Sequence, residues 1–243
     1  KTIMKKFSIL CSLLAIHLAI MAQVSLTIDT PAQNIQVSPL LYGIFYEDIN
    51  HAADGGLYAE LIRDRSFEDE KTLSAAWSLS SIPNQSSCEI IRSSLLNSAQ
   101  KQALKWQIDA SSQKPVSLNN SGFWGINVVD GQKYRLSFWA KGNYKGKLKA
   151  CLSSANGKQP LAECQIKKRI NSQWSQYTAT LTAKGNDAKA QFQFIAEGKG
   201  TICLDVVSLF PPTFKGRENG CRPDLAQMLA ELHPKFMRFP GGC

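Results

Sequence analysis

Charged residues are scarce in this sequence: Asp, Glu, Lys and Arg together make up 19% of its 243 positions, whereas hydrophobic residues make up 44%. Disordered segments combine low hydrophobicity with high net charge, so this composition argues against an extended disordered region. The sequence also lacks a low-complexity linker and a repeat of fixed period. We therefore expect one or two globular domains with a sizeable core.

Basic residues form no continuous block, although the formal net charge is +9. They are scattered, as in Lys141, Lys145, Lys147 and Lys149, and form no recognisable nucleic-acid-binding motif. A solvated surface explains such a distribution more simply, and we expect no nucleic-acid partner.

The sequence also lacks an uninterrupted apolar run of the roughly 20 residues that span a bilayer. The apolar run at residues 7–21 is shorter and is interrupted by the polar residues Ser12 and His17. It follows two lysines, and the small residue Ala22 comes after it. This pattern is typical of a secretion signal. We expect residues 1–22 to be a signal peptide with stray upstream residues, and the mature protein to be secreted or periplasmic without a membrane association.

Residues 40–65 have the sequence pattern of an α/β unit. Residues 40–46 form a nearly continuous apolar run, as expected of a strand buried on both faces, and polar residues crowd its carboxyl end. Leu57, Leu61 and Ile62 can share one face of a helix. The segment therefore predicts a strand, a loop and a helix.

Further strands and a helix are predicted before this unit and near the other end of the sequence. Residues 24–39 alternate apolar and polar side chains and predict one or two short strands. Residues 224–234 have apolar side chains at helical spacing and predict a helix that ends at a proline. Residues 235–240 predict a second buried strand.

In residues 77–210, by contrast, the alternation of apolar and polar side chains is typical of many short strands. Turn signals at residues 130–131, 156–157 and 198–200 have spacings suited to an antiparallel sandwich. Cys151 and Cys164 flank the second turn, and either plausible hairpin register places them on one face of the sheet. A disulfide and two reduced cysteines both remain open.

The order of these elements predicts a multidomain protein that combines α/β and all-β parts: the start of a (β/α)8 TIM barrel, interrupted by an antiparallel β-sandwich of jelly-roll type. We expect amino-terminal strands and the first β/α unit at residues 23–71, the sandwich at residues 72–212 and the continuation of the barrel at residues 213–243. A complete barrel needs about 250 residues of its own, so we expect an incomplete barrel in this chain.

Two long strings resemble a known family: LYGIFYEDINHAADGGLYAELIRDRSFE and DVVSLFPPTFKGRENGCRPDLAQMLAELHPKFMRFPGGC. Both resemble α-L-arabinofuranosidases of glycoside hydrolase family 51. Between them, YRLSFWAKG and ICLDVVSLF are similar to a family 4/9-type carbohydrate-binding module. The resemblance implies a retaining glycosidase that needs no cofactor and releases terminal arabinofuranose from arabinan or arabinoxylan.

Glu47 is the acid that this resemblance singles out, because it ends an apolar strand on the barrel face where a sugar would lie. The matching glutamate of the family hydrogen-bonds the arabinose and is not the nucleophile, and a carboxylate suits this role since it accepts from two hydroxyls at once. Gly241 and Cys243 match the same sugar pocket. The two catalytic glutamates of the family lie on later strands, so we expect them beyond Cys243 and no catalytic residue in this chain.

Polar neighbours of Glu47 have supporting roles in this interpretation. Asp48, Asn50 and His51 are expected to fix the loop by hydrogen bonds rather than to hold a metal, because they lack the ligand spacing of a zinc motif. Arg63 and Arg238 are candidates to support the carboxylates by charge-assisted pairing, with solvated side chains as the alternative.

Phe123 and Trp124, beside glycines in the string SGFWG, are better candidates than the other tryptophans for an exposed platform on which a glycan stacks, but burial in the core is favoured even for these two. The other tryptophans are expected mostly in the core. Two rival functions remain open: a non-catalytic carbohydrate-binding module and an endo-acting glycanase on the same barrel. The strings on either side of the sandwich favour the arabinofuranosidase, and the oligomeric state is left open.

Overall fold

The computed structural model describes residues 25–28, 36–80, 85–110 and 114–240. The expected signal peptide at residues 1–22 lies outside these ranges, as do Gly241 and Cys243. The chain divides into two compact units, residues 1–41 and residues 42–243, and every strand and helix below belongs to the second. Within the described ranges, no helix has the length and apolar character to cross a membrane.

The short strands predicted within residues 24–39 are absent from the described part of that range. Leu26, Ile28 and Val37 are 66% to 83% exposed. A strand needs a neighbour that satisfies its backbone hydrogen bonds, and no described segment pairs with these residues. Alternation of apolar and polar side chains was therefore not sufficient here.

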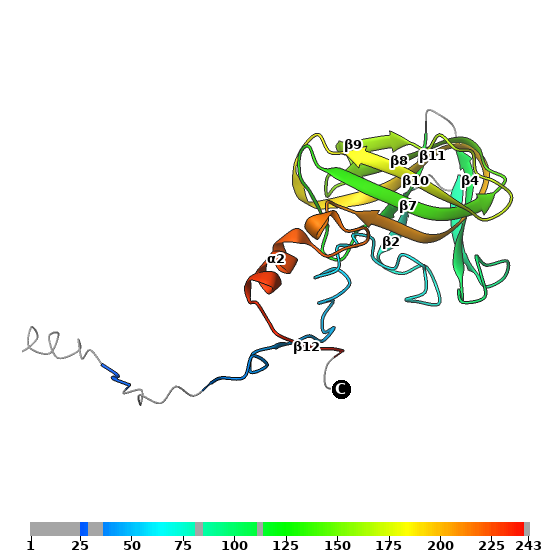
Figure 1. Cartoon of the computed structure of the whole chain (residues 1–243). Helices are drawn as coiled ribbons and strands as arrows, with labels where there is room; N and C mark the ends of the chain where they lie inside the picture. The colour runs from blue at the N-terminus through cyan, green and yellow to red at the C-terminus, as the bar shows by residue number, and fades with distance from the viewer. Residues whose placement is uncertain (1–24, 29–35, 81–84, 111–113, 241–243) are drawn as a thin grey trace, which may run out of the picture. The chain divides into compact units, whose positions relative to one another are not determined.

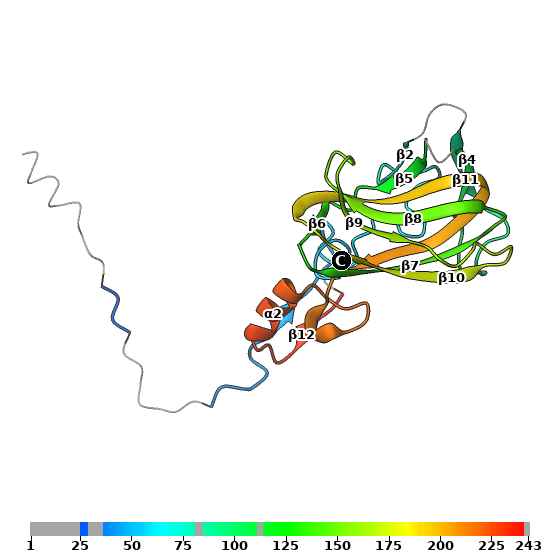
Figure 2. The ribbon, with the colours of Figure 1, turned by 90° about the horizontal axis from the view of Figure 1, so that it is seen from above.

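Strand β11 (Asp187–Phe210) organises the sandwich because it belongs to both of its layers. Its first half pairs with β8 and β5, and its second half pairs with β7 and β4. Figure 2 shows the yellow part of β11 beside β8 and its orange part beside β7. One long strand thus joins the two layers through its own backbone.

The two layers have the strand orders β9–β8–β11–β5–β2 and β10–β7–β11–β4–β3, and all these pairings are antiparallel (Figure 1). Short strand β6 pairs with the start of β11. This arrangement confirms the expected antiparallel sandwich. The bounds are β2 Trp77–Ser80, β3 Ser86–Ile91, β4 Ala103–Ala110, β5 Val116–Asn120, β6 Ile126–Val128, β7 Lys133–Gly142, β8 Lys145–Ser153, β9 Pro160–Gln165 and β10 Ser175–Thr182.

Gly198 and Gly200 let β11 pass from one layer to the other. Their φ angles of 131° and 130° are rarely adopted by residues with a side chain, and a Cβ at Gly198 would overlap the backbone of Lys145. The sequence predicts a turn between two strands here, but Gly198 still pairs with both β8 and β4. The prediction of a turn at residues 198–200 is therefore wrong, whereas the turns predicted at residues 130–131 and 156–157 are confirmed.

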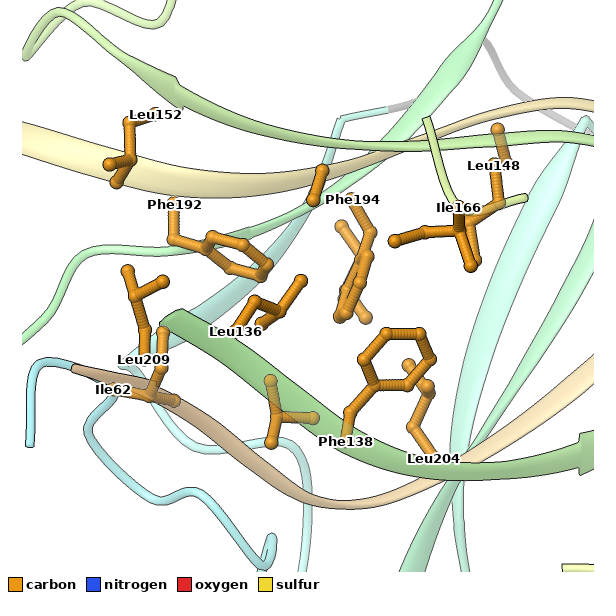
Figure 3. Packing of buried hydrophobic residues seen from close by; sticks show 14 of the residues in the cluster. Ile62, Leu136, Phe138, Leu148, Leu152, Ile166, Phe192, Phe194, Leu204 and Leu209 are labelled. Atoms are coloured by element: carbon orange, nitrogen blue, oxygen red, sulfur yellow. The ribbon is translucent and has the colours of Figure 1, made fainter. Parts of the chain in front are cut away.

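The core between the layers consists of large apolar side chains. Figure 3 shows Phe192 and Phe194 of β11 together with Leu136 and Phe138 of β7, and all four are at most 2% exposed. The ring centroids of Phe138 and Phe194 are 4.9 Å apart in an edge-to-face contact. Alternate residues of β7 point inward, which leaves Trp139 half-buried on the outer face of its sheet.

The other tryptophans divide by position. Trp77 and Trp106 are buried, which confirms the expected core placement for these two. Trp174 is half-buried and lies under the ammonium group of Lys141, 5.2 Å from its ring centroid. Trp124 is 58% exposed. The core alternative for Trp124 is therefore wrong.

The helix predicted over residues 57–65 is absent, because this segment bonds to the end of β11 instead. The Leu61 N–H donates to the Leu209 carbonyl at 3.0 Å. The buried carboxylate of Glu60 accepts a hydrogen bond from the Leu209 N–H at 2.8 Å. Partners nearly 150 positions away in sequence thus replace the local hydrogen bonds of a helix.

Two short strands and a helix complete the second unit. Helix α2 (Pro223–Glu231) follows the 3-10 helix η1 (Phe214–Gly216) and confirms the helix predicted near residues 224–234. Strand β1 (Ile44–Phe45) pairs in parallel with β12 (Met237–Arg238). Phe45 and Met237 are 54% and 49% exposed, so the expectation of strands buried on both faces is wrong within the described residues. No described segment packs over them closely enough to bury them.

Cys151 and Cys164 are free and lie on opposite faces of their hairpin. Cys164 pairs with Ala150, whereas Cys151 pairs with Glu163, the residue before Cys164 in β9. The register shifts near Pro160 by one extra residue in β9, and a shift of one residue moves every following side chain to the other face. The expectation that both cysteines share a face is therefore wrong.

Candidate functional site

Glu47 lies just beyond the carboxyl end of β1. The Tyr46 N–H donates to the Arg238 carbonyl at 3.0 Å, which continues the parallel pairing with β12 up to the residue before Glu47. The Glu47 carbonyl then accepts from the Ile49 N–H at 3.1 Å and starts a tight turn. Glu47 is half-buried. Gly241 and Cys243, its expected partners in the pocket, lie outside the described residues.

The loop after Glu47 is fixed in part as the sequence indicates. The Asp48 carboxylate accepts a hydrogen bond from the Ala53 N–H at 2.8 Å. Asn50 and His51 have positive φ angles of 52° and 62°, a conformation that asparagine and histidine tolerate better than most residues. Within the described ranges, no three His, Cys, Asp or Glu residues are grouped so that they could hold a metal ion.

The two candidate supporting arginines make contacts other than ion pairs in the described part of the chain. Arg63 is held through its backbone, because its carbonyl accepts from the Asn120 side-chain amide at 2.9 Å. Arg238 is exposed, and its guanidinium carbon lies 5.6 Å from the ring centroid of Phe45. The ion pairs found among the described residues include neither arginine. Their pairing with carboxylates stays a prediction.

An aromatic cluster joins the Glu47 loop to the sandwich. It consists of His51, Phe123 and Trp124: the His51 ring centroid lies 5.3 Å from that of Phe123 and 5.7 Å from that of Trp124, both in edge contacts. The Phe123 ring also packs against Gly55, where a Cβ would overlap it. The structure thus brings together two groups of predicted site residues that are some 70 positions apart in sequence.

A pocket of about 460 Å³ borders this cluster. Phe123 and Trp124 contribute to its wall, together with an ion pair in which Arg222 donates to Asp224 at 3.1 Å and 2.6 Å. The hydrogen bonds from Arg222 lower the pKa of Asp224, so this carboxylate stays charged. Aromatic faces beside hydrogen-bonding groups are the elements with which proteins hold sugars.

Glu60, which the sequence analysis did not single out, closes the floor of this region. It is 2% exposed, and its carboxylate accepts from the N–H groups of Leu61, Ile62 and Leu209 and from the Ser208 hydroxyl. Burial raises its pKa, while these hydrogen bonds act in the opposite direction. The one feature of the sequence that could have indicated its role is that it is an acid within an otherwise largely apolar segment. Because its oxygens are occupied, Glu60 anchors the segment rather than binding a ligand.

Comparisons with known proteins show which families the chain resembles. A family described as a carbohydrate binding domain matches residues 59–201. Over 90% of its length the chain is 36% identical to α-L-arabinofuranosidase 1 of Arabidopsis thaliana and 37% identical to an extracellular exo-α-L-arabinofuranosidase of Streptomyces chartreusis. It covers 34% and 26% of these relatives, so it spans about a quarter to a third of their length.

A solved structure extends the likeness to three dimensions. The arabinose-bound MgGH51 α-L-arabinofuranosidase matches with a TM-score of 0.75 at 35% identity, over 84% of this chain and 34% of that chain. The resemblance carried by the two sequence strings is thereby confirmed.

Proposed function

The chain belongs to the carbohydrate binding domain family through residues 59–201, and from this premise we propose that it is the amino-terminal part of a secreted, retaining α-L-arabinofuranosidase acting on arabinan or arabinoxylan. The observation that carries the proposal is the likeness to the MgGH51 enzyme, which covers 84% of the chain and so extends beyond the sandwich. A separate binding module has no need of β1, α2 and β12.

In this proposal β1, α2 and β12 open a TIM barrel. Parallel pairing of β1 with β12 and a helix just before β12 are what a βα-barrel requires. Large apolar side chains of this region are also exposed, as they would be if further strands and helices covered them in the whole protein. They are Tyr42, Phe45, Ile49, Met228, Leu232, Phe236, Met237 and Phe239.

Glu47 has a binding role in this enzyme. Its place after β1 is the carboxyl end of a barrel strand, where active sites of this fold lie. There it accepts hydrogen bonds from the hydroxyls of a terminal arabinofuranosyl unit, and Gly241 and Cys243 complete the wall of that pocket. Arg63 and Arg238 pair with carboxylates of the continuing barrel. The acid/base and the nucleophile, about 5 to 5.5 Å apart in a retaining enzyme, lie beyond Cys243.

Secretion follows from the leader-like residues 1–22 in this proposal. The Streptomyces relative is named as an extracellular enzyme, which agrees with an extracellular place of action. Arabinose-containing polysaccharides are large and lie outside the cell, so an enzyme that acts on them is exported.

Glycan binding without hydrolysis is the second candidate, and the family match over residues 59–201 favours it because that match alone implies only binding. The two candidates differ in what the flanking segments do. In an arabinofuranosidase the Glu47 loop contacts the substrate, whereas in a binding module it serves only to pack against the sandwich.

The proposal is tested with the protein that comprises this chain and its in-frame continuation. We expect it to release arabinose from an aryl α-L-arabinofuranoside and from arabinan, and proton NMR of the first product should show the α-anomer, since retention preserves the configuration. A β-anomer would contradict the retaining mechanism. Release of oligosaccharides alone would favour the endo-acting glycanase, and binding without release would leave only the module.

A further inference from the structure

The pocket beside the aromatic cluster is formed by three parts of the chain. Its walls come from residues 55–61, from the end of the sandwich around Phe123 and Trp124, and from residues 211–224. Its volume of about 460 Å³ falls within the range of about 300 to 1,000 Å³ that is typical of small-molecule sites. The pocket therefore exists only where the sandwich and its flanking segments meet.

Trp124 is the most conspicuous residue of this pocket. Among the described residues of the sandwich, it is the one large apolar side chain that is exposed. It is also held in place, because its carbonyl accepts a hydrogen bond from the Lys189 ammonium at 2.9 Å and the His51 ring packs against it. An exposed aromatic ring that is fixed in advance loses little conformational entropy when a ligand covers it.

The two cationic side chains that line the pocket already have partners within the protein. Arg222 pairs with Asp224, and Lys189 is engaged by the Trp124 carbonyl. A phosphate or a carboxylated ligand would have to compete with these contacts, whereas a neutral ligand leaves them intact. The guanidinium and carboxylate still have unused donors and acceptors that can reach hydroxyl groups.

We propose that this pocket binds a neutral glycosyl unit of the arabinose-containing glycan, with the C–H face of the sugar on the Trp124 ring and its hydroxyls on Arg222 and Asp224. The inference rests on the proposed function, because that function supplies the class of glycan. It assigns glycan binding to the end of the sandwich, and not to the outer sheet face that carries Trp139.

The pocket is coupled to the Glu47 loop through His51. Glu47 and His51 are four positions apart in sequence, so their Cα atoms are at most about 14 Å apart. His51 in turn contacts both aromatic residues of the pocket wall. A glycan of a few units can span such a distance, so one chain can occupy the pocket while its terminal unit lies at Glu47. The inserted sandwich thereby lengthens the substrate-binding site.

Isothermal titration calorimetry of the full 243-residue chain with arabinotetraose tests the inference. Loss of a stacking platform typically costs at least about tenfold in affinity, so we expect Trp124→Ala to weaken binding by that factor or more. Trp139→Ala is the matched control and should leave the Kd unchanged. Unfolding temperatures of both variants show whether the fold is retained.

A second variant blocks the pocket without removing the platform. Ala188 is exposed and lines the pocket, so Ala188→Trp should fill the space and weaken arabinotetraose binding while the unfolding temperature stays the same. Loss of binding with Trp139→Ala alone, binding that survives both Trp124→Ala and Ala188→Trp, or no binding by the unaltered chain would each overturn the inference. None of these results bears on arabinose release by the longer protein, which tests the proposed function separately.

Discussion

The sandwich and the segments that flank it differ in how they cover their apolar side chains. In the described part of the sandwich, Trp124 is the one large apolar side chain that is exposed. In residues 42–49 and 228–239, by contrast, eight large apolar side chains are about half exposed or more. The sandwich thus buries its own large apolar side chains, whereas the flanking segments leave theirs exposed. This difference is what the proposed insertion of the sandwich into a second fold would produce.

Truncation of one phenylalanine in each region should show the difference in packing with the largest effect. Phe194 is fully buried and packs against Phe138 and Phe192, so Phe194→Ala should lower the free energy of unfolding by about 3 to 5 kcal/mol. Phe45 is 54% exposed, and Phe45→Ala should change it by less than about 1 kcal/mol in this chain. Urea unfolding measures both. Equal losses would show that the flanking strands are already packed.

Removal of the Glu60 carboxylate tests how the segment at the junction between the two regions is held. Glu60→Ala leaves the buried N–H groups of Ile62 and Leu209 without their acceptor, and we expect a loss of about 2 to 4 kcal/mol in the free energy of unfolding. Glu163→Ala, on the exposed side of β9, is the control and should change the stability by less than about 0.5 kcal/mol. A Glu60 effect as small as that of Glu163 would mean that the segment is held by other contacts.

A smaller effect, visible as a pH dependence, is expected from Asp205 in the second half of β11. Burial raises the pKa of this carboxyl from 3.8 to about 7, and the charge of Glu68 adds to the rise while a hydrogen bond from the Val206 N–H opposes it. Its other oxygen has no partner among the described residues. Because the folded state holds this proton more tightly than the unfolded state, stability should fall as the pH rises from about 4 to about 7.

Asp205→Asn removes this titration and should flatten that slope, measured as the urea midpoint at several pH values. The control is Asp109→Asn, which changes an exposed carboxylate paired with Lys199 at 2.9 Å and should leave the slope unchanged. An unchanged slope in Asp205→Asn would show that the carboxyl is ionised in the folded protein.

Local periodicity predicted the sandwich because each strand shows its inner face in its own sequence. In β7 every second residue is buried, and this alternation is visible without knowledge of the partner strands. The continuity of β11 was not predictable in this way. Its Gly198–Gly200 string has the composition of a turn, and only the pairing of Gly198 with both layers shows that the strand continues.

The site was less predictable because its contacts join distant parts of the sequence. Residues 57–65 have the apolar spacing of a helix, but Glu60 finds its partners at Ser208 and Leu209. The sequence could name His51 and Trp124 separately, since one follows a polar strand end and the other lies between glycines. It could not indicate that their rings meet. Glu47 was placed by resemblance, and its role in binding stays a prediction.

The central claim, that this chain supplies the sugar-binding carboxylate of an α-L-arabinofuranosidase, is tested most directly by kcat/KM of Glu47→Gln in the protein that continues past Cys243. The amide keeps the shape but loses the charge, so hydrolysis of an aryl α-L-arabinofuranoside should become tens to hundreds of times slower, equivalent to about 2 to 4 kcal/mol, with the fold intact. Glu163→Gln should behave like the wild type. Added azide should not restore the rate, because it replaces a nucleophile and not a positioning carboxylate. Wild-type kinetics in Glu47→Gln would place Glu47 outside the site, and rescue by azide would identify it as the nucleophile, so either result contradicts this account.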